Sequence, residues 1–132
     1  MLKNNTENKH PEVKNIYEVL EGINLGLIKK GKFIQALKEL LLLSVDHMEN
    51  PKLWLMVGLV YTRISFWKPA IEALETSLHF DPNDNQTKQV LSLALFSVGR
   101  KEEACKLIDQ VCSKKSANGA QWMLRAYLHA HT

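Results

Sequence analysis

The stretch Trp54-Leu-Met-Val-Gly-Leu-Val-Tyr61 decides the fold of this chain. Its bulky and small residues recur at positions i, i+3, i+4 and i+7, the spacing of one face of an α-helix: Trp54, Val57, Gly58 and Tyr61. Pro69 then fits the first turn of a second helix, where its missing N–H removes no hydrogen bond. The segment Asp81-Pro-Asn-Asp84 ends that helix, because proline cannot continue it. The middle of the chain therefore predicts a pair of helices joined by a short turn.

The same pattern recurs with a period of 34 residues. Ala36, Ala70 and Ala104 are each 34 residues apart. Three frames of that length, 17–50, 51–84 and 85–118, bring further side chains of similar kind into register. The matched sets are Leu20, Trp54 and Lys88; Ile23, Val57 and Leu91; Asn24, Gly58 and Ser92; Gly31, Ser65 and Gly99; and Leu40, Leu74 and Ile108. A fixed period of this length indicates a stack of repeated structural units, so we expect three helical hairpins.

The small residues of the pattern have a mechanical explanation. Gly58 and Ala70 allow the two helices of a hairpin to approach closely, while larger neighbours fill the space around the crossing. A bulky side chain at either position is expected to overpack the crossing and to lower the stability by roughly 1–3 kcal/mol.

These positions resemble the signature of the tetratricopeptide repeat. The middle frame carries the resemblance through Trp54-x2-Val57-Gly58-x2-Tyr61, Ala70-x3-Leu74 and Pro82, whereas Lys88 and Asn24 depart from it in the outer frames. The resemblance implies an all-α fold, a right-handed superhelix of three helix-turn-helix repeats. We expect one domain over residues 12–132 and a disordered tail over 1–11. Residues 119–131 are expected to form a solvating, C-terminal capping helix with Arg125 facing outward.

The resemblance also implies which side chains line the concave face, namely those on the first helix of each repeat. The residues expected there to contact a partner are Leu25, Ile28, Lys29, Lys52, Leu55, Leu59, Thr62, Arg63, Gln89, Leu93 and Phe96. Their six apolar members predict a continuous strip edged by basic groups, suited to an apolar peptide or an amphipathic helix. The alternative is that some of them turn into the hairpin cores, or that the capping helix covers them.

One known subclass of such repeats grips the terminal carboxylate of its partner with Lys, Asn and Arg side chains. The matching positions here hold Glu21, Leu25, Met56, Gln86 and Val90, which cannot supply that positive charge. Recognition of a chaperone tail in this manner is therefore not expected.

Charge and composition exclude other classes of function. The net charge of +3 arises wholly from residues 100–132, where basic groups are not dense enough, or interleaved with enough aromatics, to predict a nucleic-acid groove. The longest apolar run is about half of a membrane span, so no membrane insertion is expected. The five histidines lack the spacing of a zinc site, and there is no glycine-rich phosphate loop. We expect no enzyme activity, metal or cofactor.

The two cysteines indicate a reducing compartment. Cys105 and Cys112 are seven residues apart, or about 10.5 Å along a helix, which is too far for a disulfide. Two free thiols and a polar start of the chain are typical of a cytoplasmic protein.

Among small proteins built from three such repeats, the chain is similar to the cytoplasmic chaperones of bacterial type III secretion. That resemblance implies a partner protein, an aggregation-prone secreted or export-apparatus subunit held in the groove without chemistry. A generic scaffold or co-chaperone and a self-associating adaptor are the alternatives, and a homodimer or a second small chaperone in the complex stays open. Of the adjacent Phe66 and Trp67, one is expected to plug the next repeat and the other to be left for solvent or a dimer contact.

Overall fold

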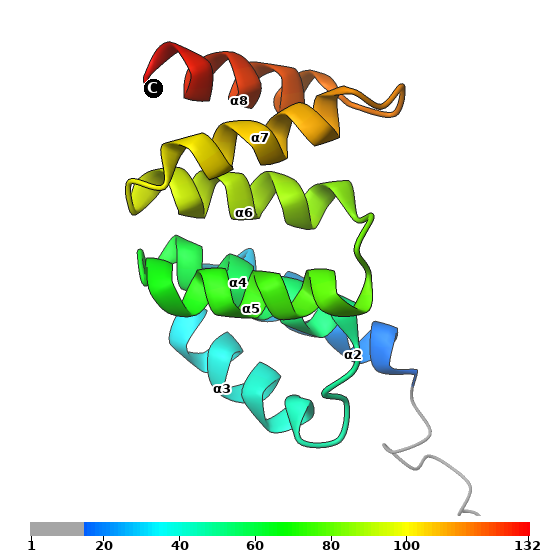
Figure 1. The fold of residues 1–132 in the computed structure, drawn as a ribbon. Coiled ribbons are helices and arrows are strands. Elements are labelled where there is room, and N and C mark those ends of the chain that lie inside the picture. The colour runs from blue at the N-terminus through cyan, green and yellow to red at the C-terminus, as the bar shows by residue number, and fades with distance from the viewer. Residues whose placement is uncertain (1–14) are drawn as a thin grey trace, which may run out of the picture.

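The computed structural model describes residues 15–132, and the tail expected at 1–11 lies outside them. The described chain forms α2 (Ile16–Ile23), the π-helical turn η2 (Asn24–Ile28), α3 (Phe33–Ser44), α4 (Pro51–Arg63), α5 (Trp67–Phe80), α6 (Asn85–Ser97), α7 (Lys101–Cys112) and α8 (Gly119–Ala130) (Figure 1). No strand occurs between residues 15 and 132. The all-α prediction is confirmed. In the same range, no helix combines the length and the apolar character that crossing a membrane requires.

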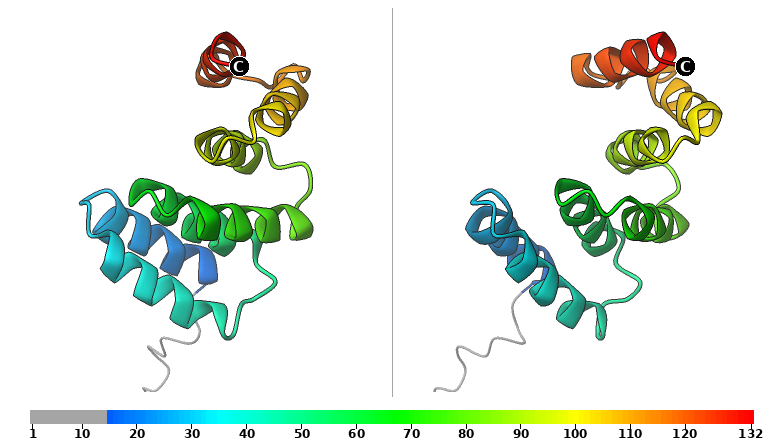
Figure 2. Two further views of the ribbon diagram at one scale, coloured as in Figure 1. Left: turned by 60° about the vertical axis from the view of Figure 1, so that its left-hand side comes forward. Right: turned by 90° about the vertical axis from the view of Figure 1, so that its left-hand side faces the viewer.

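The helices pack as successive hairpins. The pairs are α2 and η2 with α3, α4 with α5, and α6 with α7, while α8 packs on α7. Figure 2 shows that α4, α6 and α8 lie along one side of the stack and that α5 and α7 lie along the other. The predicted superhelix of three hairpins with one further helix at its C-terminal end is therefore confirmed.

The 34-residue register is the register of the hydrophobic core. Ala36, Ala70 and Ala104 are completely buried, and so are the residues four positions later in each repeat: Leu40, Leu74 and Ile108. The core divides into one cluster around α2, α3 and α4 and a second that extends from α4 and α5 to α8. Each repeat thus buries its second helix against its own first helix and against its neighbour.

Gly58 marks a close approach of α4 to α5. A Cβ atom built on Gly58 would lie 2.5 Å from both Cγ and Cδ2 of the buried Leu74 on α5. No real Cβ tolerates that separation, so a hydrogen atom is the only side chain that fits without displacing Leu74. The first repeat has Asn24 at this position, and there the first helix changes to the π-helical turn η2.

The turn inside each hairpin also repeats every 34 residues. Gly31, Ser65 and Gly99 adopt φ values of 77°, 62° and 90°, in the left-handed region. In every case this residue donates its N–H three residues back, and the next residue donates five residues back, for example Phe66 N to Tyr61 O at 2.9 Å. This is the Schellman motif that satisfies the last carbonyl groups of a helix. Its accompanying contact is visible at the middle turn, where the Phe66 ring stacks on Tyr61.

The turn explains the two adjacent aromatic residues. Phe66 contacts the helix that it follows and remains exposed, whereas Trp67 packs against the core cluster that includes α6 and α7. The expectation that one of the pair packs and the other faces solvent is confirmed.

Replacing Ser65 with glycine is expected to raise the free energy of unfolding by about 1 kcal/mol, because an L-residue is strained at positive φ and glycine is not. The matched change Gly99→Ala should lower it by a similar amount, since a Cβ there meets nothing within 4 Å and only the backbone is affected. Urea unfolding followed by circular dichroism measures both. A Ser65→Gly variant no more stable than the parent would contradict the argument.

The helix α8 forms at the C-terminal end of the stack as predicted and most of its side chains are exposed, but Arg125 lies in its contact with α7. Arg125, expected to face outward, is half-buried and binds Asp109 of α7. The exposed side of α8 instead carries Trp122, Met123 and Tyr127. The register explains the difference, because the position that is apolar in the other repeats faces a carboxylate on α7 here.

Candidate functional site

A hollow of about 410 Å³ opens on the side of the stack formed by α4, α6 and α8. It is lined by Leu59, Thr62 and Arg63 of α4, Trp67 of α5, Gln89, Val90 and Leu93 of α6, and Ala120 and Leu124 of α8. The helices α4, α6 and α8 thus contribute to one surface, although Leu59 and Leu124 are 65 positions apart in the chain.

The floor of the hollow is apolar. Leu59, Val90 and Leu124 are partly buried and pack on the core cluster that runs from α4 to α8. Leu93, by contrast, is exposed at the rim. A bound apolar side chain would therefore continue the existing core outward, removing further apolar surface from water.

The polar edge of the hollow is basic. Thr62 donates its hydroxyl to the carbonyl of Leu59 at 2.7 Å, so that hydrogen is already used within α4. The exposed Arg63 lies with its guanidinium 6.0 Å from the centre of the Phe33 ring. No acidic side chain lines the hollow, and within residues 15–132 no carboxylate forms an ion pair with Arg63. The edge is therefore suited to a partner with negative charge beside its apolar residues.

The structure brings together five of the residues predicted to bind a partner. Leu59, Thr62, Arg63, Gln89 and Leu93 all line this hollow. Their contact with a partner stays a prediction.

The predicted continuous strip is wrong, because two of its members belong to the core. Ile28 is 6% exposed and Leu55 is 3% exposed. Ile28 packs in the cluster around α2 to α4, and Leu55 packs in the cluster that reaches α7 and α8. The first helices turn these positions toward the adjoining repeat, which was the alternative considered for them.

The remaining predicted residues lie away from the hollow. Leu25 and Lys29 are exposed at the far end of the stack, in and just after η2. Lys52 lines a separate, smaller hollow of about 220 Å³ near the start of α4. Phe96 is partly buried against the core, with the Tyr127 ring centre at 6.0 Å and the Lys101 ammonium at 5.2 Å from the centre of its ring.

Sequence reasoning missed four residues of the hollow: Trp67, Val90, Ala120 and Leu124. The sequence contains a signal from which two of them could have been predicted. Ala120 and Leu124 lie 34 positions after Gln86 and Val90, so one further application of the period places them on the same face.

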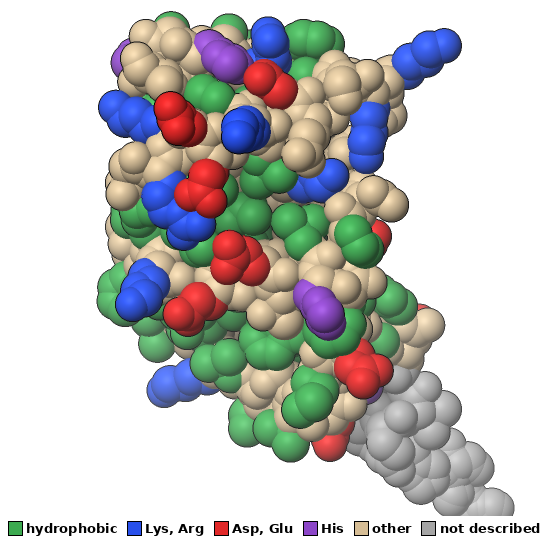
Figure 3. Space-filling model, in the orientation of Figure 1, with side chains coloured by type: hydrophobic (Ala, Val, Ile, Leu, Met, Phe, Trp, Pro, Cys, Tyr) green, Lys and Arg blue, Asp and Glu red, His purple; other side chains and the backbone are tan. Residues whose placement is uncertain are grey.

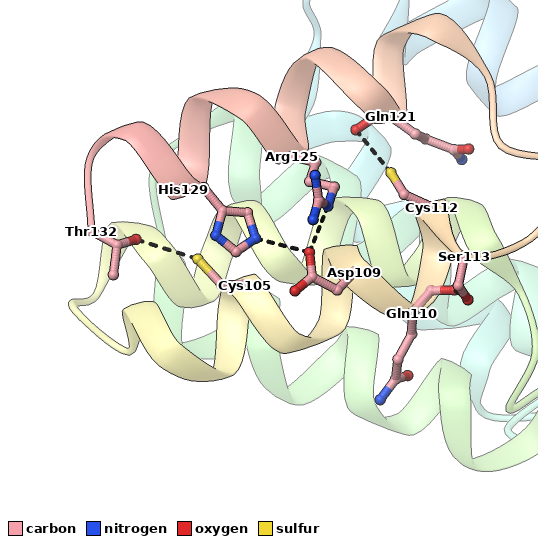
Figure 4. A network of polar contacts seen from close by, with 9 residues as sticks. All are labelled: Cys105, Asp109, Gln110, Cys112, Ser113, Gln121, Arg125, His129 and Thr132. Carbon is pink, nitrogen blue, oxygen red and sulfur yellow. Dashed lines mark hydrogen bonds and ion pairs between the residues drawn. The ribbon is translucent and has the colours of Figure 1, made fainter.

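The α8 wall of the hollow is held to α7 by a polar network (Figure 4). Asp109 Oδ1 lies 2.7 Å from Arg125 Nε and 2.8 Å from His129 Nε2. Partial burial raises the pKa of the Asp109 carboxyl, but hydrogen bonds with His129 and Arg125 outweigh it and hold the pKa below its ordinary value. At neutral pH the carboxylate is therefore ionised and can bind both α8 side chains.

The two cysteines belong to the same contact between α7 and α8. Both are free and buried, and the prediction that they do not pair is confirmed. Cys112 donates its thiol to the Gln121 carbonyl at 3.5 Å, and Cys105 Sγ lies 3.3 Å from Thr132 Oγ1 (Figure 4). Burial raises the pKa of the Cys112 thiol, which keeps it protonated and able to donate.

A capping box fixes the start of α8 beside the hollow. The Asn118 side chain accepts from the Gln121 N–H, and the Gln121 side chain accepts from the Asn118 N–H, each at 3.0 Å. The helix is thus anchored at its first turn and along its length. Within residues 15–132 no three His, Cys, Asp or Glu side chains are grouped so that they could hold a metal ion.

Solved structures share this architecture. The first tetratricopeptide domain of Spaghetti (RPAP3) bound to an HSP90 peptide matches with a TM-score of 0.79 and 18% identity, over 86% of this chain and 90% of that one. PcrH in complex with the chaperone-binding region of PopD matches with a TM-score of 0.71 and 16% identity, over 88% and 87%. The type III secretion translocator chaperone SycD of Yersinia enterocolitica matches with a TM-score of 0.72 and 16% identity, over 86% and 79%.

The chain spans only 66% of the length of MamA, another protein whose structure it matches. No protein-family model matches the chain, and no curated protein sequence matches it either. The sequence identities are low and the structural agreement is high. This combination, together with the 34-residue core register, shows that the chain has the fold of the tetratricopeptide repeat proteins.

Proposed function

We propose that the hollow between α4, α6 and α8 holds an apolar segment of a partner protein, and that the chain is a cytoplasmic chaperone of bacterial type III secretion. The observation that carries the proposal is the hollow itself: an open apolar floor with one arginine and no carboxylate at its edge. The client is a secreted or export-apparatus subunit that aggregates when alone. The complex with a binding region of PopD and the chaperone role of SycD, both in proteins of this fold, support this choice.

The lining residues define the segment that fits. Aliphatic or aromatic side chains of the segment cover Leu59, Val90 and Leu93, and an acidic residue beside them pairs with Arg63. The Gln89 amide forms no hydrogen bond with any described residue, so it is available to a peptide group of the segment. An apolar peptide and one face of an amphipathic helix both satisfy these requirements.

The chaperone acts by covering and releasing this segment, with no chemical step. The hollow removes from water an apolar surface of the client that would otherwise bind other copies of the client.

Co-expression with the small apolar proteins encoded beside this chain, followed by affinity purification, tests the proposal. One client should become soluble and co-purify. The Leu93→Glu variant should bind it at least about tenfold more weakly, because a carboxylate then stands at the apolar rim. Circular dichroism should be unchanged, since Leu93 is exposed.

The control is Leu25→Glu, which places the same charge on an exposed leucine outside the hollow. It should bind the client as the parent does. Loss of binding by Leu25→Glu together with full binding by Leu93→Glu would place the client elsewhere and refute the assignment of the hollow.

A further inference from the structure

The turns inside the three hairpins form one edge of the stack. In Figure 1 the turns 29–32, 64–66 and 98–100 lie on the left, and the connections between hairpins lie on the right. In Figure 3, which has the same orientation, Lys and Arg side chains follow one another down that left edge. This surface, called the basic edge below, has six exposed cationic residues in or beside the turns: Lys29, Lys30, Lys32, Lys68, Arg100 and Lys101.

Most of this positive charge is not neutralised within the described chain. Arg100 forms an ion pair with Glu103. No carboxylate of residues 15–132 forms an ion pair with any of the five lysines. Lys101 donates to the His131 carbonyl at 3.2 Å, and this neutral acceptor leaves the ammonium group charged. The basic edge is therefore expected to attract anions.

Acidic side chains interrupt the basic edge only at its third turn, where Glu102 and Glu103 open α7. Glu72 and Glu75 begin one turn beyond Lys68 on α5, where they line a hollow of about 420 Å³. Further acidic residues belong to the connections at the opposite edge, namely Asp46, Glu49, Asp81 and Asp84. Positive charge is thus concentrated where the chain turns inside its hairpins.

An exposed apolar side chain stands beside the cations at each turn. Ile34 and Phe66 are each 57% exposed, and Val98 is 42% exposed. Each of the three lies two positions from a cation of the basic edge. A membrane accepts both kinds of side chain, because its headgroups can be anionic and its acyl chains are apolar. A nucleic acid would favour aromatic side chains for stacking, and Phe66 is the only aromatic residue of the three.

We propose that the basic edge binds the surface of a membrane that contains anionic lipids. Its cationic groups lie among the lipid headgroups, while Ile34, Phe66 and Val98 enter the boundary between headgroups and acyl chains. None of these residues lines the hollow between α4, α6 and α8. The chain can therefore hold a client and a membrane at the same time, and the membrane site does not depend on the identity of the client.

Co-sedimentation of the full chain with lipid vesicles tests the proposal. The protein should bind vesicles of phosphatidylcholine mixed with phosphatidylserine, and it should stay in solution with vesicles of phosphatidylcholine alone. Binding should weaken as the salt concentration rises, because salt screens the attraction between lysines and headgroups. Equal binding to both kinds of vesicle, or binding to neither, overturns the proposal.

A pair of lysine variants tests whether the basic edge makes the contact. Lys30→Ala with Lys68→Ala should weaken binding to the anionic vesicles at least about tenfold, because each cation near such a surface contributes about a fivefold gain in affinity. The matched control, Lys52→Ala with Lys115→Ala, removes the same charge from two exposed residues at the opposite edge. It should bind within about twofold of the parent. Equal losses in the two double variants would show that only the net charge matters and would overturn the assignment to this edge.

An apolar variant separates a membrane from other polyanions. Phe66→Ala should weaken binding to the anionic vesicles about fivefold, because less apolar surface enters the lipid. Val98→Ser gives the same measurement at the third turn, where the contact between Phe66 and Tyr61 is not disturbed. The control is Leu42→Ala, which shortens an exposed side chain of α3 outside the turns and should bind as the parent does.

Two results of these measurements would reject a lipid partner. If both Phe66→Ala and Val98→Ser bound the anionic vesicles as tightly as the parent, no apolar contact with the membrane would exist. Binding of polyuridylic acid in preference to the anionic vesicles would assign the basic edge to nucleic acid instead.

Discussion

Replacing Gly58 with alanine should lower the free energy of unfolding by about 1–3 kcal/mol, the usual penalty for overpacking a core. The added Cβ would lie 2.5 Å from two carbon atoms of Leu74. Leu74 cannot move aside cheaply, because it is completely buried between α4 and the next repeat. Equilibrium unfolding in urea measures the loss, and the slope of the transition should be unchanged if the native and unfolded states keep their surfaces.

The third repeat supplies the control for this prediction. At the positions of Gly58 and Leu74 it carries Ser92 and Ile108, both completely buried. Ser92 donates its hydroxyl to the Gln89 carbonyl at 2.7 Å, so the serine is satisfied within its own helix. The pair of changes Gly58→Ser and Leu74→Ile should therefore recover part of the stability that Gly58→Ser alone loses. If the single and double variants were equally unstable, close approach to Leu74 would not be the cause.

Replacing Leu128 with alanine should lower the free energy of unfolding by about 2–4 kcal/mol. The loss comes from the contact between α8 and α7. Leu128 is completely buried and belongs to the core cluster that contains Ala104, Ile108 and Val111 of α7. Because each repeat of such a stack contacts only the adjoining repeats, the loss should be concentrated at the end of the molecule. Hydrogen exchange should accelerate in α8 and stay slow in α4.

The control for Leu128 lies on the same helix. Met123→Ala removes an exposed side chain of α8 and should change the stability by no more than about 0.5 kcal/mol. Client binding gives a second measurement, since α8 provides Ala120 and Leu124 to the hollow. A Leu128→Ala variant whose α8 amides remain as protected as those of the parent would show that the Asp109 network alone seats this helix.

The fold could be predicted because the residues that form its core recur every 34 positions in the sequence. Ala36, Ala70 and Ala104 share one position of the repeat, and all three are completely buried. The register even tolerates Lys88 at the place of the partly buried Trp54, since Lys88 is buried at that position. A pattern repeated three times survives such single departures.

The candidate site could be predicted only in part. The period shows on which face of a helix a residue lies, but it does not show whether that residue is buried in the core or exposed. Leu55 and Leu59 are one turn apart on the same face of α4, yet Leu55 is core and Leu59 lines the hollow. What decides between them is how far the neighbouring repeat reaches, which depends on the packing of α5 and α6. Arg125 was misplaced for a related reason, since its partner Asp109 lies on a different helix.

The recurring left-handed turn has a consequence for how the chain acquires its shape. Each turn closes through backbone hydrogen bonds that span at most five residues. These bonds can form without contacts to segments that are distant in the sequence. Contacts of short sequence separation form quickly and carry little entropic penalty for loop closure. Any of the three hairpins can therefore nucleate folding, and a fault in one of them leaves two other starting points from which order can spread.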